Sequence, residues 1–315
     1  MSAGREITPA PTEGAPEEDA NKSTTGLSSR AETPVGSTMD RARQPVYGQG
    51  IVVSLIAAAF LLILAILAVR ERESVTGTPA TETTGPLFWG LAVLFTILIG
   101  IGAQFSEISA ARSAAALGHP RRKRDYPTAW IIPVAGMFAA ILLVATLHST
   151  AMFVAGPVIA FFAVGGSLLA RDLLDDATDT TMRTAATVHT IVIHVVAFLG
   201  LSAIYLNKMS LWGAVPLVAI FSFFLILENL ERGNAEMQQR AFYAFLGAIV
   251  LSVVTVFLNW WLTYGWTGGG VLLVAFYAVA GILLVQTQHG VVRRRDLVEF
   301  LAVGAIVLAV LIITM

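Results

Sequence analysis

The sequence predicts an all-α protein, a polytopic integral membrane bundle of about nine transmembrane helices. Three observations predict this class. Hydrophobic residues make up 56% of the 315 residues and charged residues only 13%, whereas a soluble domain carries about 25% charged residues. The mean hydropathy is +0.74. Uncharged apolar runs of about 18 to 22 residues recur along the chain, and a helix needs roughly 20 such residues to cross the hydrocarbon core of a bilayer.

The N-terminal segment, residues 1–48, differs from the rest of the chain in composition. It is rich in Pro, Glu, Ser, Thr and Gly and has almost no large aliphatic or aromatic residues. Such a segment buries too little apolar surface to offset the entropy of ordering it. We therefore predict a disordered cytoplasmic tail at 1–48 and a transmembrane helical domain at 49–315. The first apolar run begins too late for a secretory signal peptide.

The apolar runs give the expected spans. After the second span, residues 105–112 keep good helix formers, so that helix is expected to continue into the aqueous phase until Gly118 and Pro120. Very short turns at 148–151, 207–210 and 263–268 predict antiparallel helix pairs. Eight helices is the alternative, if the first span is peripheral. The spans are expected at about 51–69, 87–104, 128–147, 152–170, 186–206, 211–228, 241–262, 269–286 and 297–314.

The distribution of Lys and Arg predicts the orientation. If the loop at 105–127 is cytoplasmic, its side of the membrane holds 17 of the Lys and Arg residues and the opposite side holds three. Basic residues concentrate in the cytoplasmic loops of membrane proteins. We therefore expect a multi-pass protein of the inner (cytoplasmic) membrane, with its N-terminus in the cytoplasm and its C-terminus on the outer side.

Composition also excludes several kinds of function. The chain has no cysteine, which excludes disulfides, thiolate catalysis and Cys-ligated iron–sulfur clusters. A net charge of -1 and the absence of a basic face argue against a nucleic-acid partner. The expected partners are membrane lipids, with other membrane proteins as a second class.

Four consecutive basic residues, Arg121, Arg122, Lys123 and Arg124, form the densest positive cluster of the chain. One interpretation is a topology signal that keeps this loop in the cytoplasm. The other is a site for anionic lipids, because each basic residue near an anionic membrane surface contributes about 1 kcal/mol. The two interpretations are compatible.

An aspartate-rich stretch follows the fourth span and is the candidate metal site. Residues three or four apart share a helix face, so these carboxylates are able to point in one direction. Mg²⁺ in proteins is commonly held by one or two carboxylates together with substrate phosphates. The candidate ligands are Asp172, Asp175, Asp176 and Asp179.

The DDxxD pattern formed by Asp175, Asp176 and Asp179 resembles the aspartate-rich motif of enzymes that use prenyl diphosphates. A bundle of nine helices with a cytoplasmic N-terminus is similar to membrane prenyltransferases of the UbiA type. The resemblance implies Mg²⁺ as cofactor and a lipid diphosphate as substrate. That family carries its two motifs after the second and sixth spans. In this chain the first of those loops is basic, and the second offers glutamates but no aspartate.

Two histidines and one glutamate in the spans are candidates for a ligand site or a proton relay. His189 and His194 both lie in the fifth span. Because a helix turns about 100° per residue, two residues five apart lie on different faces and would not bind one metal together. Glu228 ends the sixth span. Ionisable groups in membrane spans are costly and often functional, although a histidine bonded to a neighbouring helix is the simpler interpretation.

These features leave three functional hypotheses. The leading one is a non-enzymatic membrane scaffold, or a carrier for an apolar or lipid-like ligand, without a cofactor. It follows from the lack of charges at the centres of the spans, of an ATP-binding motif and of a soluble domain. The second is a Mg²⁺-dependent enzyme acting on a lipid diphosphate. The third is a secondary transporter for a small solute, centred on His189 and His194.

Overall fold

The computed structural model describes residues 48–70, 84–116, 128–175, 181–233, 235–260 and 266–313. All of them belong to one compact unit, Pro45–Met315. Residues 1–47, nearly all of the expected disordered tail, lie outside the described residues, so that expectation stays a prediction.

Every regular element in the described ranges is helical, and these ranges contain no strand. The all-helical class of a polytopic membrane bundle is therefore confirmed. The elements are α2 (Gly48–Arg70), α4 (Pro86–Ala116), α5 (Ile131–Leu147), α6 (Met152–Asp175), α7 (Met182–Leu206), α8 (Leu211–Asn229), the 3₁₀ turn η1 (Leu230–Arg232), α9 (Met237–Trp260), α10 (Thr267–His289) and α11 (Arg294–Ile313).

The helix ends agree with the sequence patterns at several points. The turn between α5 and α6 occupies residues 148–151, and the turn between α7 and α8 occupies 207–210, as expected. His148 closes α5 in the left-handed conformation, with φ of 42°, and its backbone N–H donates to the carbonyl of Val144. α4 runs to Ala116, which confirms that it continues beyond the apolar span.

Seven of the described helices are long and apolar enough to cross a membrane: α2, α4, α6, α7, α8 with η1, α9 and α10. α5 is a shorter apolar helix of 17 residues. α11 falls outside both groups; its first six residues include four charged ones. Nine described helices thus occupy the expected positions, while the number that cross the membrane stays a prediction.

α5 is the shortest of the described α-helices and lies at the centre of the bundle. Nearly all of its residues are buried, and it packs against α2, α4, α6, α7 and α8. Its sequence is apolar on every face, which is typical of a helix enclosed by other helices. A 17-residue helix is about 25 Å long, less than the hydrocarbon core of roughly 30 Å. Because its neighbours enclose it, α5 does not have to match the thickness of the lipid.

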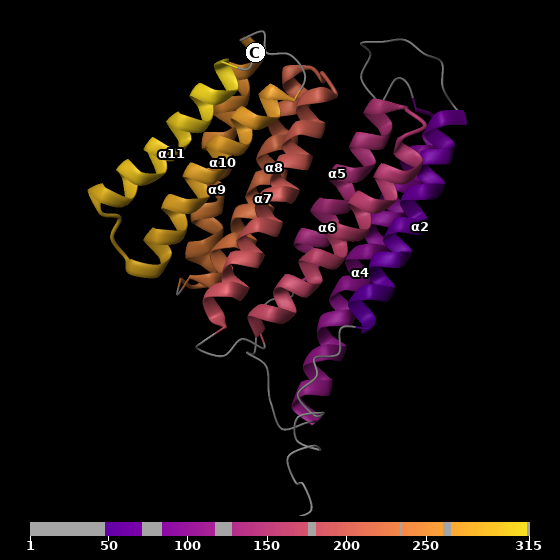
Figure 1. Ribbon diagram of the computed structural model, residues 1–315, viewed down its shortest axis with the longest axis horizontal. Helices are drawn as coiled ribbons and strands as arrows, with labels where there is room; N and C mark the ends of the chain where they lie inside the picture. The colour runs from indigo at the N-terminus through magenta and orange to yellow at the C-terminus, as the bar shows by residue number, and fades with distance from the viewer. Residues whose placement is uncertain are drawn as a thin grey trace, which may run out of the picture. The chain divides into compact units, whose positions relative to one another are not determined.

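Two groups of helices surround this centre (Figure 1). α2, α4 and α6 pack with α5, and α7 to α11 form the second group, joined to the first through α7 and α8. Small residues bring the backbones close. A Cβ atom on Gly136 of α5 would lie 2.7 Å from the Cβ of Ala163 on α6, and one on Gly165 would lie 2.6 Å from Ser54 Oγ on α2. Such contacts are a common means of packing helices in lipid.

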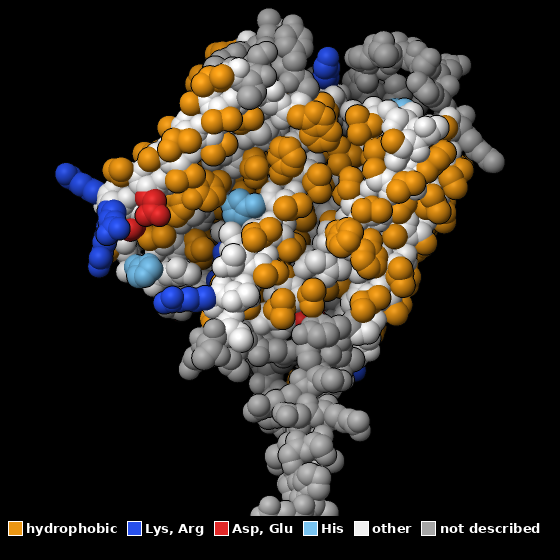
Figure 2. Space-filling view, viewed as in Figure 1, with side chains coloured by type: hydrophobic (Ala, Val, Ile, Leu, Met, Phe, Trp, Pro, Cys, Tyr) orange, Lys and Arg blue, Asp and Glu red, His pale blue; other side chains and the backbone are white. Residues whose placement is uncertain are grey.

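The outer surface agrees with a membrane environment. Figure 2 shows apolar side chains over much of the viewed face, with basic and acidic side chains gathered at its lower left edge. In Figure 1 this edge carries the turn between α10 and α11. Arg293 of that turn and Arg294 and Arg295 at the start of α11 are exposed. On the viewed face, most of the charged side chains therefore lie near one end of α10 and α11.

Candidate functional site

The most polar part of the interior is a group of charged side chains at one end of the bundle, which we call the Arg171 cluster. The C-terminal parts of α4, α6 and α8 meet the beginnings of α5 and α7 there, because successive helices are antiparallel. The cluster consists of Glu107 on α4, Thr128 before α5, Arg171 on α6, His189 on α7, Glu228 on α8 and Glu231 on η1.

Arg171 is the hub of this cluster. Its Nη1 forms a short hydrogen-bonded ion pair with Glu228 Oε1, and both side chains are almost completely buried, at 6% and 1% exposed. Its Nη2 lies 3.3 Å from Glu107 Oε1. Nη1 lies 3.4 Å from Glu231 Oε2. One guanidinium therefore faces carboxylates from three different elements, and charge-assisted hydrogen bonds of this kind are about twice as strong as neutral ones.

A hydroxyl completes the arrangement. Arg171 Nη2 donates to Thr128 Oγ1 over 2.7 Å, and Thr128 Oγ1 donates to Glu231 Oε2 over 3.2 Å. Thr128 thus connects the guanidinium to the most distant of its carboxylates. Polar atoms come from α4, α6, α8 and Thr128, which lies just before α5. The cluster therefore fixes the relative positions of these helices.

His189 stands at the inner edge of the cluster. Its Nε2 lies 3.9 Å from Glu228 Oε1, and its side chain is only 3% exposed. Its other ring nitrogen, Nδ1, is buried and has no hydrogen-bond partner. The histidine and glutamate predicted as candidates from sequence are therefore brought together across α7 and α8.

A second arginine, Arg232, forms hydrogen bonds with one backbone carbonyl and two side chains. Arg232 Nη1 donates to the carbonyl of Ala186 over 2.9 Å and to Thr190 Oγ1 over 2.7 Å, and its Nη2 donates to Asn229 Oδ1 over 2.8 Å. These contacts join η1 to α7 beside the Arg171 cluster. They also place a second positive charge next to His189.

His194 occupies a different environment from His189. Its Nδ1 lies 2.7 Å from the carbonyl oxygen of Thr190 on the preceding turn, and its ring packs edge-on against Phe276 and Tyr277 of α10. The two histidines therefore face different neighbours, as their five-residue spacing indicates, and His194 is a packing residue between α7 and α10.

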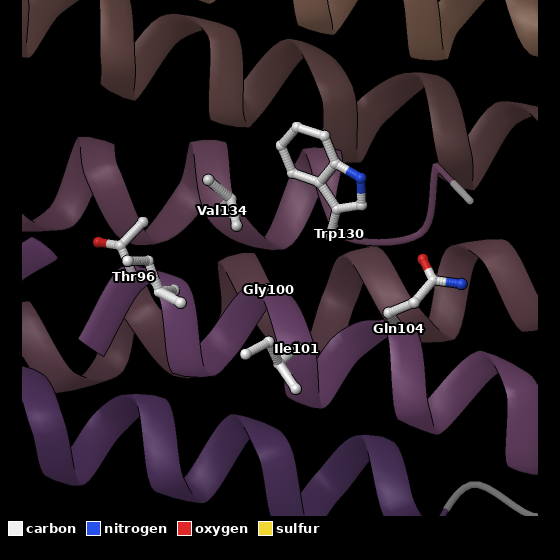
Figure 3. A pocket seen from close by; sticks show the side chains of 7 residues that line it. Thr96, Gly100, Ile101, Gln104, Trp130 and Val134 are labelled. Atoms are coloured by element: carbon white, nitrogen blue, oxygen red, sulfur yellow. The ribbon is translucent and has the colours of Figure 1, made fainter. Parts of the chain in front are cut away.

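An apolar groove between α4 and α5 is the second feature with binding potential (Figure 3). Its volume is about 350 Å³, and its surface is almost entirely apolar. It is open on one side, where Ile97 and Ile101 are about half exposed. The lining residues are Thr96, Ile97, Gly100, Ile101, Gln104, Trp130 and Val134.

Gln104 is a polar residue at one end of this apolar groove. In Figure 3 the Gln104 side chain extends from α4 toward the end where Trp130 lies. The amide oxygen of Gln104 is buried without a hydrogen-bond partner. At the other end Thr96 donates its hydroxyl to the Ala92 carbonyl of its own helix. Glu107 of the Arg171 cluster follows Gln104 by one helical turn, so the Gln104 end of the groove leads toward that cluster.

The candidate metal site from the sequence is only partly described. Asp172 and Asp175 belong to the last turn of α6, whereas Asp176 and Asp179 lie outside the described residues. Among the described residues, no group of three or more His, Asp or Glu side chains is placed to hold a metal ion. The basic residues 121–124 also lie outside the described residues, so lipid binding there stays a prediction.

The sequence alone did not predict Thr128, Glu231 or Gln104 as site residues, and it did not indicate that Arg171 is the centre of a cluster. A signal for Arg171 was present, because it directly follows an uncharged apolar run and a charge at such a boundary requires a partner. The partners themselves come from α4 and α8, 64 and 57 residues away. No local pattern indicates contacts over such separations.

Comparisons with known proteins give a family and no activity. The sequence model of a family described as "Protein of unknown function (DUF5656)" matches residues 67–314, well over half of the chain. The matched region includes α4 to α11 entirely, and therefore every helix that forms the Arg171 cluster and the groove, whereas most of α2 precedes it. No curated protein and no solved structure matches the chain.

Proposed function

The chain belongs to the family described as Protein of unknown function (DUF5656), and from that premise we propose that it is a non-enzymatic membrane protein that binds a lipid-like ligand. The ligand has one apolar chain and a head that donates a hydrogen bond, such as a hydroxyl or an amine. The apolar chain occupies the groove between α4 and α5, and the head donates to Gln104.

The observation that carries this proposal is the unpartnered amide oxygen at the end of an otherwise apolar groove. A buried acceptor without a partner costs about 1 to 3 kcal/mol, and ligand sites are typically apolar with a few polar groups that fix orientation. The groove opens beside Ile97 and Ile101, which are 54% and 50% exposed. A molecule dissolved in the bilayer therefore reaches it from the side, without passing through water.

We also propose the orientation of the protein in the cytoplasmic membrane. The exposed arginines 293–295 lie between the end of α10 and the first turn of α11. The Arg171 cluster lies at the same end, because Gly233 next to η1 is packed against Thr287 near the end of α10. Basic residues favour the cytoplasmic side. The head of the ligand then lies toward the cytoplasm and its chain toward the membrane centre.

The test is photo-crosslinking of the full-length protein in lipid nanodiscs with a long-chain alcohol that carries a diazirine in its chain. We expect labelled peptides from residues 96–104 and 130–134, and loss of that labelling when unlabelled alcohol competes. Gly100→Leu should abolish it, because a Cβ atom at Gly100 already lies 3.0 Å from Val134 and a larger side chain fills the groove. Gly90→Leu on the same helix is the matched control, since nothing lies within 4 Å of its added Cβ.

The hydrogen bond is tested by Gln104→Leu. The alcohol should lose about 2- to 10-fold in affinity, the equivalent of one hydrogen bond, whereas an alkane of the same chain length should lose nothing. Labelling spread evenly over all exposed helix faces, with no difference between Gly100→Leu and Gly90→Leu, would contradict the proposal.

A further inference from the structure

We infer that Glu228 and His189 form a proton-binding site inside the helix bundle, in which one proton is shared between the Glu228 carboxylate and His189 Nε2 beside Arg171. This inference is independent of the lipid-like ligand, because neither residue lines the groove between α4 and α5.

The geometry of the pair is the first support. Glu228 Oε1 and His189 Nε2 lie 3.9 Å apart, with both side chains almost completely buried. A small rotation of either side chain brings the two atoms to hydrogen-bond distance. A hydrogen between these two atoms is therefore shared by two basic groups whose side chains are buried together. Binding it requires no electron transfer and no other reactant.

The partners of the imidazole decide where its proton lies. Nδ1 of His189 is buried without a partner. A buried N–H without an acceptor is rare in native proteins, and an unfilled acceptor is more common. The neutral ring is therefore expected to carry its hydrogen on Nε2, directed at Glu228, with a bare lone pair on Nδ1. A further proton cannot add at Nε2, which already carries a hydrogen. It adds either to the Glu228 carboxylate or to Nδ1, and in the second case the imidazolium keeps its Nε2–H directed at Glu228.

The charges around the pair explain why it should bind a proton at all. Arg171 on α6 and Arg232 on η1 are the two guanidinium groups that act on His189. Opposing them, the carboxylates acting on Arg171 come from every other element that contributes charge here: Glu107 on α4, Asp175 on α6, Glu228 on α8 and Glu231 on η1.

The carboxylates outnumber the guanidinium groups in this region. Between Ile131 and Leu147, α5 has no titratable side chain, and α10 brings Tyr277 only to His194. Glu228 is the most deeply buried of the three carboxylates that contact Arg171, at 1% exposed, whereas Glu107 and Glu231 are 18% and 17% exposed. A buried negative charge is costly unless it is compensated. One proton on the pair of Glu228 and His189 reduces that excess where burial is deepest.

The experiment is nuclear magnetic resonance of the full chain in nanodiscs with ¹⁵N-labelled histidine. The chain has five histidines, and His189→Gln assigns the signal of His189. We expect the wild-type His189 ring to be in the Nε2–H form at high pH and to gain proton character as the pH falls. In Glu228→Gln the same change should require at least a tenfold higher proton concentration, because the compensating carboxylate is gone.

Glu231→Gln is the matched control. It removes a carboxylate of the same cluster that contacts Arg171 and is 17% exposed, so it should move the His189 titration much less than Glu228→Gln does. Circular dichroism confirms that each variant is folded.

Infrared spectroscopy of the same samples covers the case in which the proton resides on the carboxylate. A carbonyl stretch of a protonated carboxyl that disappears in Glu228→Gln supports the site. The inference is overturned if His189 stays neutral and no such carboxyl band appears at any pH at which the protein is folded. It is also overturned if the His189 titration is identical in the wild type and in Glu228→Gln.

Discussion

Arg171 near the end of α6 and Glu228 near the end of α8 form a buried ion pair between helices that are not neighbours in sequence. α7 lies between them in the chain and contributes His189 to the same region. The ion pair therefore joins α6 directly to α8, and the contact of Arg171 with Glu107 joins α6 to α4 as well. The first two predictions below test this connection, and the third tests the packing of α5 against α6.

Removing the guanidinium should destabilise the protein strongly. Arg171→Met leaves the buried carboxylate of Glu228 without its main counter-charge, and breaking a buried ion pair from one side costs about 3 to 5 kcal/mol. The measurement is the free energy of unfolding in detergent, from denaturant titration. Arg183→Met is the control, because Arg183 on α7 is exposed and should change the free energy by less than about 0.5 kcal/mol. Equal effects of the two variants would contradict the hub role of Arg171.

Removing both partners should cost less than the sum of the single changes. In Arg171→Met with Glu228→Met, neither buried charge is left uncompensated by the other, and apolar replacements of buried ion pairs are often tolerated. We expect a coupling free energy of about 2 kcal/mol, within the range measured for contacting residues. A double-mutant cycle of unfolding free energies provides the number, and additive effects would show that the two residues act separately.

The close approach of α5 and α6 should be sensitive to one methyl group. In Gly136→Ala the new Cβ lies 2.7 Å from the Cβ of Ala163, which is too close, so the helices must separate. Overpacking of this kind costs about 1 to 3 kcal/mol. Ala163→Gly in the same chain should restore most of the lost stability. Gly90→Ala is the matched control, with open space around its Cβ, and thermal unfolding ranks the four proteins.

The orientation is testable because the chain has no cysteine, so single cysteines can be introduced directly. A membrane-impermeant maleimide should label Thr150→Cys and Ser210→Cys in intact cells, since both exposed residues lie in turns on the outer side. Gln288→Cys and Arg293→Cys should be labelled only after the membrane is permeabilised. The opposite pattern would invert the proposed topology, and labelling of all four in intact cells would contradict a multi-pass arrangement.

Much of the fold followed from local patterns. The helices begin and end near the expected residues because apolar length, turn residues and the run from Phe105 to Ala116 are properties of short segments. The close approach of Gly136 to Ala163 joins α5 to α6, and no local pattern in the sequence identifies Ala163 as the partner. The position of Glu228 at the end of its span was visible in the sequence, but its partner Arg171 on α6 was not.

The site was less predictable for a physical reason. Thr128 and Glu231 acquire their roles only when α5, α6 and η1 meet, and they are unremarkable in sequence. The groove at Gln104 depends on which face of α4 meets α5, which hydropathy does not encode because both helices are apolar on nearly every face. Aspartate residues 176 and 179 and the basic residues 121–124 were visible in the sequence, but they lie outside the described residues.

Chain order gives the Arg171 cluster a consequence for biosynthesis. A ribosome releases α4 and α6 before α8, so Arg171 enters the membrane while Glu228 and Glu231 are still unmade. Glu107, made 64 residues earlier, is the one carboxylate of the three that is already present. Arg171 should therefore dock first on α4 and take Glu228 as its deeper partner only once α8 arrives. The final arrangement of α4 and α6 is therefore reached only after α8, in the last third of the chain, has been synthesised.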